Sequence, residues 1–345
     1  MNKFIDLRSD TVTNQPDFMI NAMVNAEVGD DVYNDDPTVK KLEELASDIL
    51  GKESALFVPS GTFGNQLCLF THCPRGSEVI LGDSCHIVAH EVGASSVIAG
   101  VQLRTIDSST GELSPEAIEK KLRVGYDIHM PETSLICLEN AHSNGNVIPV
   151  ESMKKTYELA KEHNLPVHLD GARIFNAAIA LNTDVKELTK YCDSVMVCLS
   201  KGLCAPFGSI IAGDKSFIDV ARKKRKLMGG GLRQVGYFAA AGIVALNEMR
   251  ARLIEDHDNA KLLATELSKI PQIEVDFNRL QINMVFFKFK DLSINTQDLI
   301  KYFFDSNIKI NDVEGGEMRF VTHYWVTKED ILKVCSSLKE FLNSK

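Results

Sequence analysis

From about Glu53 to residue 213, short apolar segments alternate with amphipathic helical segments. Each apolar segment is long enough for one strand, and most are apolar on both faces. Strands of this kind are typical of a mostly parallel sheet that helices cover on both sides. We therefore predict an α/β fold, with strands at residues 54–58, 78–81, 96–99, 101–106, 135–138, 166–169, 194–199 and 208–212.

The segments on either side of this core differ from it. The first residues include the acidic, turn-rich sequence 29–37, which is typical of an extended arm. After the core, long helices are expected over 234–266, followed by mixed strands and helices. We expect three parts: an N-terminal arm (1–48), a large α/β domain (49–245) and a small α+β C-terminal domain (246–345).

Charge and cysteine usage exclude several classes of protein. The formal net charge is −9, and the one dense basic segment, Arg222–Lys226, is local, so general attraction to nucleic acid or an anionic membrane is not expected. The residues Arg222 to Arg225 are expected to form a solvated helix face. The eight cysteines lack CxxC or zinc-type spacing, which predicts reduced, mostly buried thiols and no metal site.

The sequence also lacks the signals of secretion and membrane insertion. The N-terminus has no apolar signal-peptide core. The longest apolar stretch, residues 237–246, is about ten residues long, whereas roughly twenty are needed to span a bilayer. We expect a cytoplasmic protein without a transmembrane segment, which agrees with unpaired cysteines.

Two charged residues lie just past the ends of predicted strands. Asp170 follows the strand at 166–169, and Lys201 follows the strand at 194–199. Because the carboxyl ends of neighbouring strands meet at the ligand-binding edge of an α/β sheet, a carboxylate and an amine are expected in one pocket. A pyridoxal phosphate enzyme needs this pair: the lysine forms a Schiff base with the cofactor, and the carboxylate keeps the pyridine nitrogen protonated. The simpler alternatives are a helix N-cap for Asp170 and a surface position for Lys201.

Four further residues fit such a pocket. Gly61 and Thr62 follow the first core strand and open a helix, whose N-terminal amides can hold a phosphate; a plain capped helix start is the alternative. His86 follows the next strand, where its ring can stack on a planar cofactor or simply bond to a loop. Arg173, three residues after Asp170, can bind a substrate carboxylate or a ring oxygen.

The chain resembles the low-specificity L-threonine aldolases, pyridoxal phosphate enzymes of the aspartate aminotransferase fold type (fold type I). The resemblance covers nearly the whole chain. It rests on an ordered set of segments, at residues 5–13, 27–33, 55–62, 168–176, 193–208, 229–234 and 318–323. It implies a large domain with a mostly parallel seven-stranded sheet flanked by helices, and a small α+β C-terminal domain.

The resemblance also implies roles for individual residues. Lys201 would carry the cofactor, Asp170 would pair with its ring nitrogen and His86 would stack on the ring. The phosphate would be held by Gly61, Thr62 and Ser200. The substrate carboxylate would be held by Ser9, Arg173 and Arg319, with Arg173 also near the ring oxygen.

In the family, the neighbouring subunit completes the site, and the matching positions in this chain are Lys226 and Arg233. A site shared between subunits implies at least a dimer, and the resemblance to the family implies a homotetramer. His86 and His129 match the histidines proposed to act on the β-hydroxyl group. Four residues after His86 this chain has His90, where some members carry an aromatic residue such as tyrosine. This position is expected to influence the choice between threonine and allo-threonine, or to add a base.

The reaction implied is retro-aldol cleavage of L-threonine, L-allo-threonine or another β-hydroxy-α-amino acid to glycine and an aldehyde such as acetaldehyde. The alternatives are a serine hydroxymethyltransferase-like enzyme, a β-eliminating lyase on the same fold, and a catalytically silent scaffold. The stereochemical preference and the histidine that acts on the hydroxyl stay open at this stage.

Overall fold

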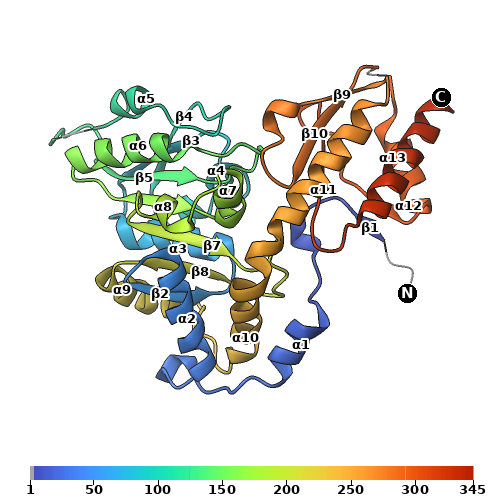
Figure 1. The fold of residues 1–345 in the computed structure, drawn as a ribbon. Helices are drawn as coiled ribbons and strands as arrows, with labels where there is room; N and C mark the ends of the chain where they lie inside the picture. Colours follow the sequence, from blue (N-terminus) through green and yellow to red (C-terminus); the bar gives the residue numbers. More distant parts are fainter. Residues whose placement is uncertain (1–3, 124, 292, 345) are drawn as a thin grey trace. The chain divides into compact units, whose positions relative to one another are not determined.

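The computed structural model describes residues 4–123, 125–291 and 293–344, and the chain divides into two compact units. The large unit runs from Gln15 to Arg250. The small unit combines the residues before Gln15 with those from Ala251 onward. The division after Arg250 lies close to the expected boundary at 245, whereas the expected arm 1–48 is divided between the two units at residue 14. Figure 1 shows the helices and strands of both units along the chain.

The large unit contains a seven-stranded sheet in the order β2-β8-β7-β6-β5-β3-β4. Neighbouring strands from β7 to β4 are parallel, and only β8 runs antiparallel to both of its neighbours, β7 and β2. The predicted α/β fold with a mostly parallel seven-stranded sheet is therefore confirmed. The strands are β2 (Ser54–Val58), β3 (Glu78–Gly82), β4 (Gln102–Ile106), β5 (Thr133–Glu139), β6 (Val167–Asp170), β7 (Ser194–Cys198) and β8 (Ser209–Gly213).

Helices cover this sheet on both faces (Figure 1). Helix α3 contacts strands β2, β5, β6, β7 and β8 and lies beside α9, while α6 contacts α5 and α8. The helices of the large unit are α1 (Asp17–Val24), α2 (Pro37–Leu50), α3 (Gly61–His72), α4 (His86–Ala89), α5 (Pro115–Glu119), α6 (Val150–Glu162), α7 (Ile174–Ala180), α8 (Val185–Thr189), α9 (Lys215–Leu227) and α10 (Gly236–Val244). Short helical turns, η2 (Asp31–Tyr33), η3 (Ser95–Ala99) and η4 (Ala245–Met249), complete it.

One predicted strand is wrong. Residues 96–99 lie in η3, a single π-helical turn that buries Ser95 and Ala99 and exposes Val97. Burial at positions four apart is the pattern of a helix face, but a run of only four apolar residues is too short for periodicity to separate helix from strand.

The basic segment on α9 is also only partly solvated, contrary to the expectation. Arg225 is buried and donates to the carboxylate of Asp31 at 2.5 Å and to the backbone carbonyl of Phe57 at 2.7 Å. Arg222 pairs with Glu43 at 2.6 Å. Sequence could not show this, because the two acidic partners come from segments far away along the chain. Lys226, by contrast, is exposed.

The small unit is built on two sheets. Three antiparallel strands lie in the order β12-β10-β9, and β1 pairs in parallel with β11. The strands are β1 (Ile5–Asp6), β9 (Ile273–Val275), β10 (Met284–Phe289), β11 (Ile308–Lys309) and β12 (Met318–Val321). The helical segments are η1 (Asp10–Val12), α11 (Arg250–Ser268), η5 (Phe277–Arg279), α12 (Thr296–Asp305) and α13 (Lys328–Asn343). An apolar core containing Phe287, Phe303 and Phe320 joins strands and helices of this unit.

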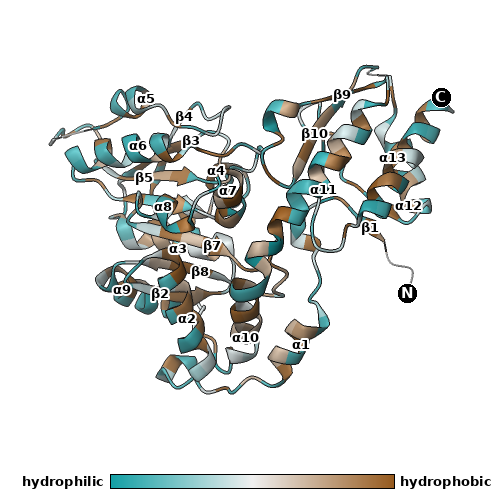
Figure 2. Cartoon of the chain, in the orientation of Figure 1, coloured by the Kyte–Doolittle hydropathy of each residue, from teal (hydrophilic) through white to brown (hydrophobic). Residues whose placement is uncertain are grey.

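Figure 2 shows the apolar character of the central strands in the large unit. All five residues of β3, β7 and β8 are buried. The eight cysteines are buried, as predicted, and are free thiols in the described part of the chain. No helix among the described residues is long and apolar enough to cross a membrane.

Candidate active site at the carboxyl edge of the sheet

Four connections place the predicted site residues along one edge of the large-unit sheet. Strands β3, β6 and β7 are mutually parallel, and β2 runs in the same direction because β8 is antiparallel to both β2 and β7. Their carboxyl ends therefore share one edge. The site residues at this edge are Gly61 and Thr62 after β2, His86 after β3, Asp170 at the end of β6, and Ser200 and Lys201 after β7.

The N-terminus of α3 begins at this edge directly after β2. Ser60 caps the helix by accepting a hydrogen bond from the Phe63 amide at 3.2 Å. Gly61 lies so close to β7 that a Cβ atom there would approach Cys198 Sγ to 2.8 Å. A side chain at this position would thus collide with the sheet. The first-turn amides have no acceptor inside the helix, which suits a bound phosphate.

Asp170 is almost completely buried, at 2% exposure. Its Oδ2 accepts a hydrogen bond from Asn65 Nδ2 at 2.7 Å, and its Oδ1 accepts one from the Ala172 amide at 3.0 Å. The Ala172 bond closes a local turn before α7, whose N-cap residue is Arg173, so Asp170 is not the helix N-cap that the simpler alternative predicted. The Asn65 bond ties the carboxylate to α3, on the face of the sheet that this helix covers.

His86 is held at both its backbone and its ring by buried carboxylates. Its amide donates to Glu139 Oε2 at 2.7 Å, and its Nδ1 lies 2.9 Å from Glu91 Oε1. The pKa of His86 is raised, because the hydrogen bond with Glu91 and the charge of Asp170 outweigh the burial of the ring and the charge of Lys201. The ring is therefore charged more readily than that of an ordinary histidine.

A chain of buried polar groups continues from Asp170 beneath α3. Asn65 Oδ1 lies 3.1 Å from His168 Nε2, whose other ring nitrogen lies 2.9 Å from Ser194 Oγ. Ser194 Oγ in turn lies 2.8 Å from His72 Nε2. Burial lowers the pKa of His168 to about 4 and that of His72 to about 3, so both rings are neutral near pH 7.

Sequence reasoning missed the residues of this network. Asn65, Glu91, Glu139 and His168 all contact the predicted site residues or each other, directly or through one amide. One signal was available: His168 and Asp170 are two residues apart on one strand and so share a face of the sheet. No comparable pattern points to Glu91, which lies in the irregular segment after α4.

Arg173 and His90 lie near this edge on short connections. Arg173 is the N-cap residue of α7, three residues after Asp170, and is partly buried. His90 ends α4 and is exposed, with its ring centroid 5.5 Å from that of His86. The structure thus brings both residues to the region in which the sequence predicted a substrate site.

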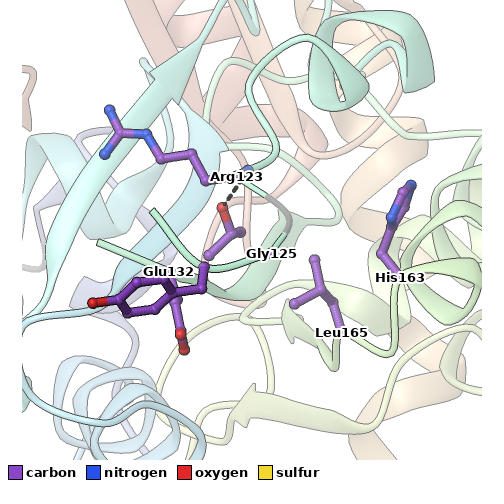
Figure 3. Close-up of a pocket in the computed structure, with 7 residues that line it drawn as sticks. Arg123, Gly125, Glu132, His163 and Leu165 are labelled. Atoms are coloured by element: carbon purple, nitrogen blue, oxygen red, sulfur yellow. Dashed lines mark hydrogen bonds between the residues drawn. The ribbon is translucent and has the colours of Figure 1, made fainter. Parts of the chain in front are cut away.

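His129 lies elsewhere. It is exposed in the connection that leads into β5, at the amino edge of the sheet, opposite to Asp170 and Lys201. Figure 3 shows this edge, where Arg123 and Glu132 approach the start of β5 and His163 and Leu165 precede β6. These residues line a cavity of about 260 Å³. Within one chain, therefore, His129 is not part of the cluster around His86.

Lys226 and Arg233, the positions expected to serve a neighbouring subunit, are both exposed on the large unit. Arg233 pairs with Asp30 at 2.8 Å, and its side chain is 54% exposed. The aliphatic part of Lys226 lies against Gly231, where a Cβ atom would come within 2.8 Å of Lys226 Cδ. Both side chains thus lie at the surface of the chain, that of Arg233 in an ion pair with Asp30.

Ser9 and Arg319 belong to the small unit. Ser9 caps η1 by accepting a hydrogen bond from the Thr11 amide at 3.2 Å. Arg319 Nη2 lies 3.5 Å from the backbone carbonyl of Arg8, so the small unit brings the two predicted substrate-binding residues together. Both side chains are partly exposed.

Among the described residues, one group has the ligand types and spacing of a metal site: His86, Glu91 and Asp170, whose ligand atoms lie within 4.8 Å of one another. Asn65 lies between the two carboxylates and donates to both. Glu91 also accepts from His86 and Gln66. Hydrogen bonds therefore account for this arrangement.

The donor set fits pyridoxal phosphate. A buried carboxylate that accepts hydrogen bonds, a partly buried lysine on the neighbouring strand end, a flanking imidazole and a helix N-terminus occupy one edge. The carboxylate suits the pyridine nitrogen of the cofactor, and the lysine amine suits its aldehyde. The imidazole suits the face of the cofactor ring, and the helix N-terminus suits the phosphate.

Comparison with known proteins agrees with this assignment. Residues 6–290 match the beta-eliminating lyase family. The chain is 47% identical over 334 residues to low-specificity L-threonine aldolase 1 of Arabidopsis thaliana, covering 95% of this chain and 93% of the relative. It is 43% identical over 339 residues to the low specificity L-threonine aldolase of Escherichia coli K12, covering 98% and 99%. The threonine aldolase structure of Leishmania major shares the fold, with a TM-score of 0.82, 18% identity, and coverage of 98% of this chain and 99% of that one.

Fold and site together define a pyridoxal phosphate-dependent enzyme of fold type I. The sequence identities assign the chain to a narrower group within this class. The chain belongs to the low-specificity L-threonine aldolase family, whose members are carbon–carbon lyases.

Proposed function

We propose that this protein cleaves L-threonine, L-allo-threonine and related β-hydroxy-α-amino acids to glycine and an aldehyde, acetaldehyde in the case of threonine. The observation that carries the proposal is the placement of Asp170 and Lys201 at the ends of the adjacent parallel strands β6 and β7, in a chain 47% identical to a threonine aldolase. A carboxylate and an amine so placed suit the two ends of one small planar cofactor.

Three parts of the chain hold the cofactor in this proposal. Lys201 holds it covalently through the side-chain amine, Asp170 pairs with the ring nitrogen, and Gly61, Thr62 and Ser200 hold the phosphate. When bound, pyridoxal phosphate supplies a ring that accepts the electrons released when the Cα–Cβ bond breaks. Lys226 and Arg233 of a second copy complete the phosphate site, which accounts for their exposure in one chain.

The remaining residues orient the substrate and move its proton. Arg173 binds the substrate carboxylate and so fixes which Cα bond faces the ring; alignment of this kind lowers the entropic part of the barrier. Ser9 and Arg319 retain their predicted role in carboxylate binding. His86 Nε2 takes the β-hydroxyl proton, since Nδ1 is engaged by Glu91 at 2.9 Å. His90 flanks His86 and contributes to the choice between threonine and allo-threonine.

His129 keeps a proposed role only as a residue of another copy of the chain, because its own loop lies at the opposite edge of the sheet. Any oligomer that brings His129 of one copy to the site of another would meet this requirement. We propose a homotetramer, and a cytoplasmic location for it; both are predictions from the sequence.

β-Elimination is the second candidate, favoured by the family match over residues 6–290. Purified protein with pyridoxal phosphate and L-threonine, without folate, separates the candidates. Glycine and acetaldehyde in equal amounts support the aldolase. Ammonia and a keto acid support elimination. A serine hydroxymethyltransferase-like reaction is supported if a parallel assay with L-serine forms glycine only when tetrahydrofolate is added.

The matched control is Lys201→Ala, which is expected to abolish cleavage and to weaken retention of the cofactor. Parallel assays with L-allo-threonine and the D enantiomers decide stereochemistry. Activity confined to the D substrates would overturn the L assignment.

A further inference from the structure

The segment that follows β3 contains a buried acid with no assigned role. Glu91 is 1% exposed and lies between the short helix α4 and Val92, which is 98% exposed. A carboxylate so completely buried needs compensation from hydrogen-bond donors, because the charged form is costly to remove from water. The donors around it therefore indicate what it does.

Three side chains donate to this carboxylate. Its Oε1 accepts from Asn65 Nδ2 at 2.8 Å, and its Oε2 accepts from Gln66 Nε2 at 2.6 Å. The third is His86, whose Nδ1 lies 2.9 Å from Oε1. Because the acid is already surrounded by amide donors, it acts as an acceptor, and His86 Nδ1 carries the proton of this bond.

We propose that Glu91 is a positioning residue for His86: its carboxylate accepts the Nδ1 proton, fixes the plane of the imidazole and leaves Nε2 as the atom that exchanges protons with substrate. The same arrangement of carboxylate, imidazole and reacting group orients the general base in hydrolases that use a catalytic triad. This inference deepens the proposed function and rests on it, since it assigns His86 the proton transfer.

The hydrogen bonds of Asn65 extend this role to the carboxylate at the end of β6. One amide nitrogen donates to Glu91 at 2.8 Å and to Asp170 at 2.7 Å. The two acids, which would otherwise repel each other, are thus held at a fixed separation on either side of one donor. The position of the His86 imidazole is thereby coupled to that of Asp170, the proposed partner of the cofactor's pyridine nitrogen.

The charge environment of His86 supports the proposal. The raised pKa of the imidazole has the Glu91 hydrogen bond as its largest cause. Several other ionisable groups face His86 or contact it from the surrounding elements: Asp170, Lys201, His90 and Glu139. Glu139 differs from Glu91 because it accepts from the backbone amide of His86 and not from the ring.

Glu91→Gln is the decisive variant, and the local structure can accommodate it. Among the described residues, Gln66 Oε1 has no hydrogen-bond partner. If the Gln66 amide turns over, this oxygen can accept from the introduced side-chain amide, whose own oxygen still accepts from His86 Nδ1. The variant thus removes the charge and keeps the shape. Glu139→Gln is the matched control, because it makes the same chemical change at the backbone contact.

The main measurement is the pKa of His86 by NMR in the full chain labelled with ¹³C at histidine Cε1, with and without pyridoxal phosphate. The His86 signal is assigned by its loss in His86→Gln. Glu91→Gln is expected to lower the pKa of His86 by about 1 unit, a tenfold loss of proton affinity. Glu139→Gln is expected to lower it by less than half as much.

The second measurement is the pH dependence of kcat/KM for threonine cleavage. Its acidic limb is expected to move to lower pH by the same amount in Glu91→Gln, with kcat reduced and KM little changed. Glu91→Asp keeps the negative charge but shortens the side chain. Compared with Glu91→Gln, it should bring the pKa of His86 back toward that of the unaltered protein more fully than it restores kcat. An unchanged pKa in Glu91→Gln, or a shift equal to that of Glu139→Gln, overturns the proposal. The NMR measurement does not depend on threonine cleavage. Failure of the Glu91 proposal can therefore be distinguished from failure of the proposed aldolase function.

Discussion

Asn65 Nδ2 on α3 donates a hydrogen bond of 2.7 Å to Asp170 Oδ2 at the end of β6. The same amide binds Glu91 and, through its oxygen, His168. A single buried side chain therefore connects the two acids of the site with the polar chain beneath α3. A buried polar network of this kind is costly to interrupt, because each group left without a partner keeps its full desolvation penalty.

Asn65→Ala is expected to lower the free energy of unfolding by about 2–4 kcal/mol, since three buried groups lose a partner at about 1–3 kcal/mol each before relaxation. Pyridoxal phosphate affinity should also fall, because Asp170 then keeps only the hydrogen bond from the Ala172 amide. Urea unfolding and a spectroscopic cofactor titration measure the two effects. Asn25→Ala is the control: this amide makes an exposed bond of 2.8 Å to the Asn21 carbonyl, and its loss should change stability by less than about 0.5 kcal/mol.

His86→Gln should lower kcat for threonine cleavage by about 10²–10⁴-fold, the usual contribution of a general base. The circular dichroism spectrum should change little, because Gln can keep a hydrogen bond to Glu91, and the assay is run with saturating pyridoxal phosphate because the flat ring that flanks the cofactor is lost. Full activity in this variant would remove His86 from the proton transfer.

His129 tests whether a second chain contributes to the site. Since His129 lies at the amino edge of its own sheet, it can act at the carboxyl edge only across subunits. His129→Gln and Lys201→Ala should each be impaired alone, and hybrids formed by coexpression should regain activity at sites that combine one intact copy of each residue. Hybrids without recovered activity would mean that His129 has no role in a neighbouring site.

Val92→Gly should stabilise the protein. Val92 has a φ of 55°, in the left-handed region that a β-branched residue rarely adopts, and its side chain is 98% exposed, so little burial is lost. Relief of this strain should exceed the extra entropy of glycine in the unfolded chain and give a net gain of roughly 0.5–1 kcal/mol in chemical denaturation. Val97→Gly is the matched control: it is also exposed, but it lies in a helical turn, and it should lose about 1 kcal/mol.

Acid should destabilise the large unit through His168. Burial lowers the pKa of this ring to about 4 in the folded protein, against about 6.5 in the unfolded chain. Because the folded protein binds this proton more weakly than the unfolded chain, the free energy of unfolding keeps its full value above pH 6.5. It decreases as the pH falls from 6.5 toward 4, by about 3 kcal/mol at most. His168→Gln should therefore show a smaller loss of stability between pH 7.5 and 5.0 than the unaltered protein.

Denaturant midpoints at the two pH values provide the measurement. His163→Gln, a partly exposed histidine of the same unit, is the control and should retain the full pH dependence. His72, whose pKa burial lowers to about 3, adds to the loss in every variant, so His168→Gln should remove only part of it.

Much of the fold could be predicted because its signals are local. Apolar segments such as Ser194–Cys198 are short, buried on both faces and followed at once by polar or glycine-containing turns, which is enough to recognise a central strand. The wrong strand at 96–99 shows the limit of such signals, since four apolar residues suit a helical turn equally well. The burial of Arg225 shows another, because its partner Asp31 is remote in sequence.

The sequence by itself determined the α/β architecture, the positions of Asp170, Lys201, Gly61 and His86 at strand ends, and the family. Each depends on residues close together along the chain, where periodicity and motif spacing act. Only the tertiary structure decided that Glu91 and Glu139 hold His86, that Asn65 joins Glu91 to Asp170, and that His129 lies at the other edge. Hydrogen bonds between side chains of separate elements depend on register and burial in three dimensions, which no local pattern in the sequence encodes.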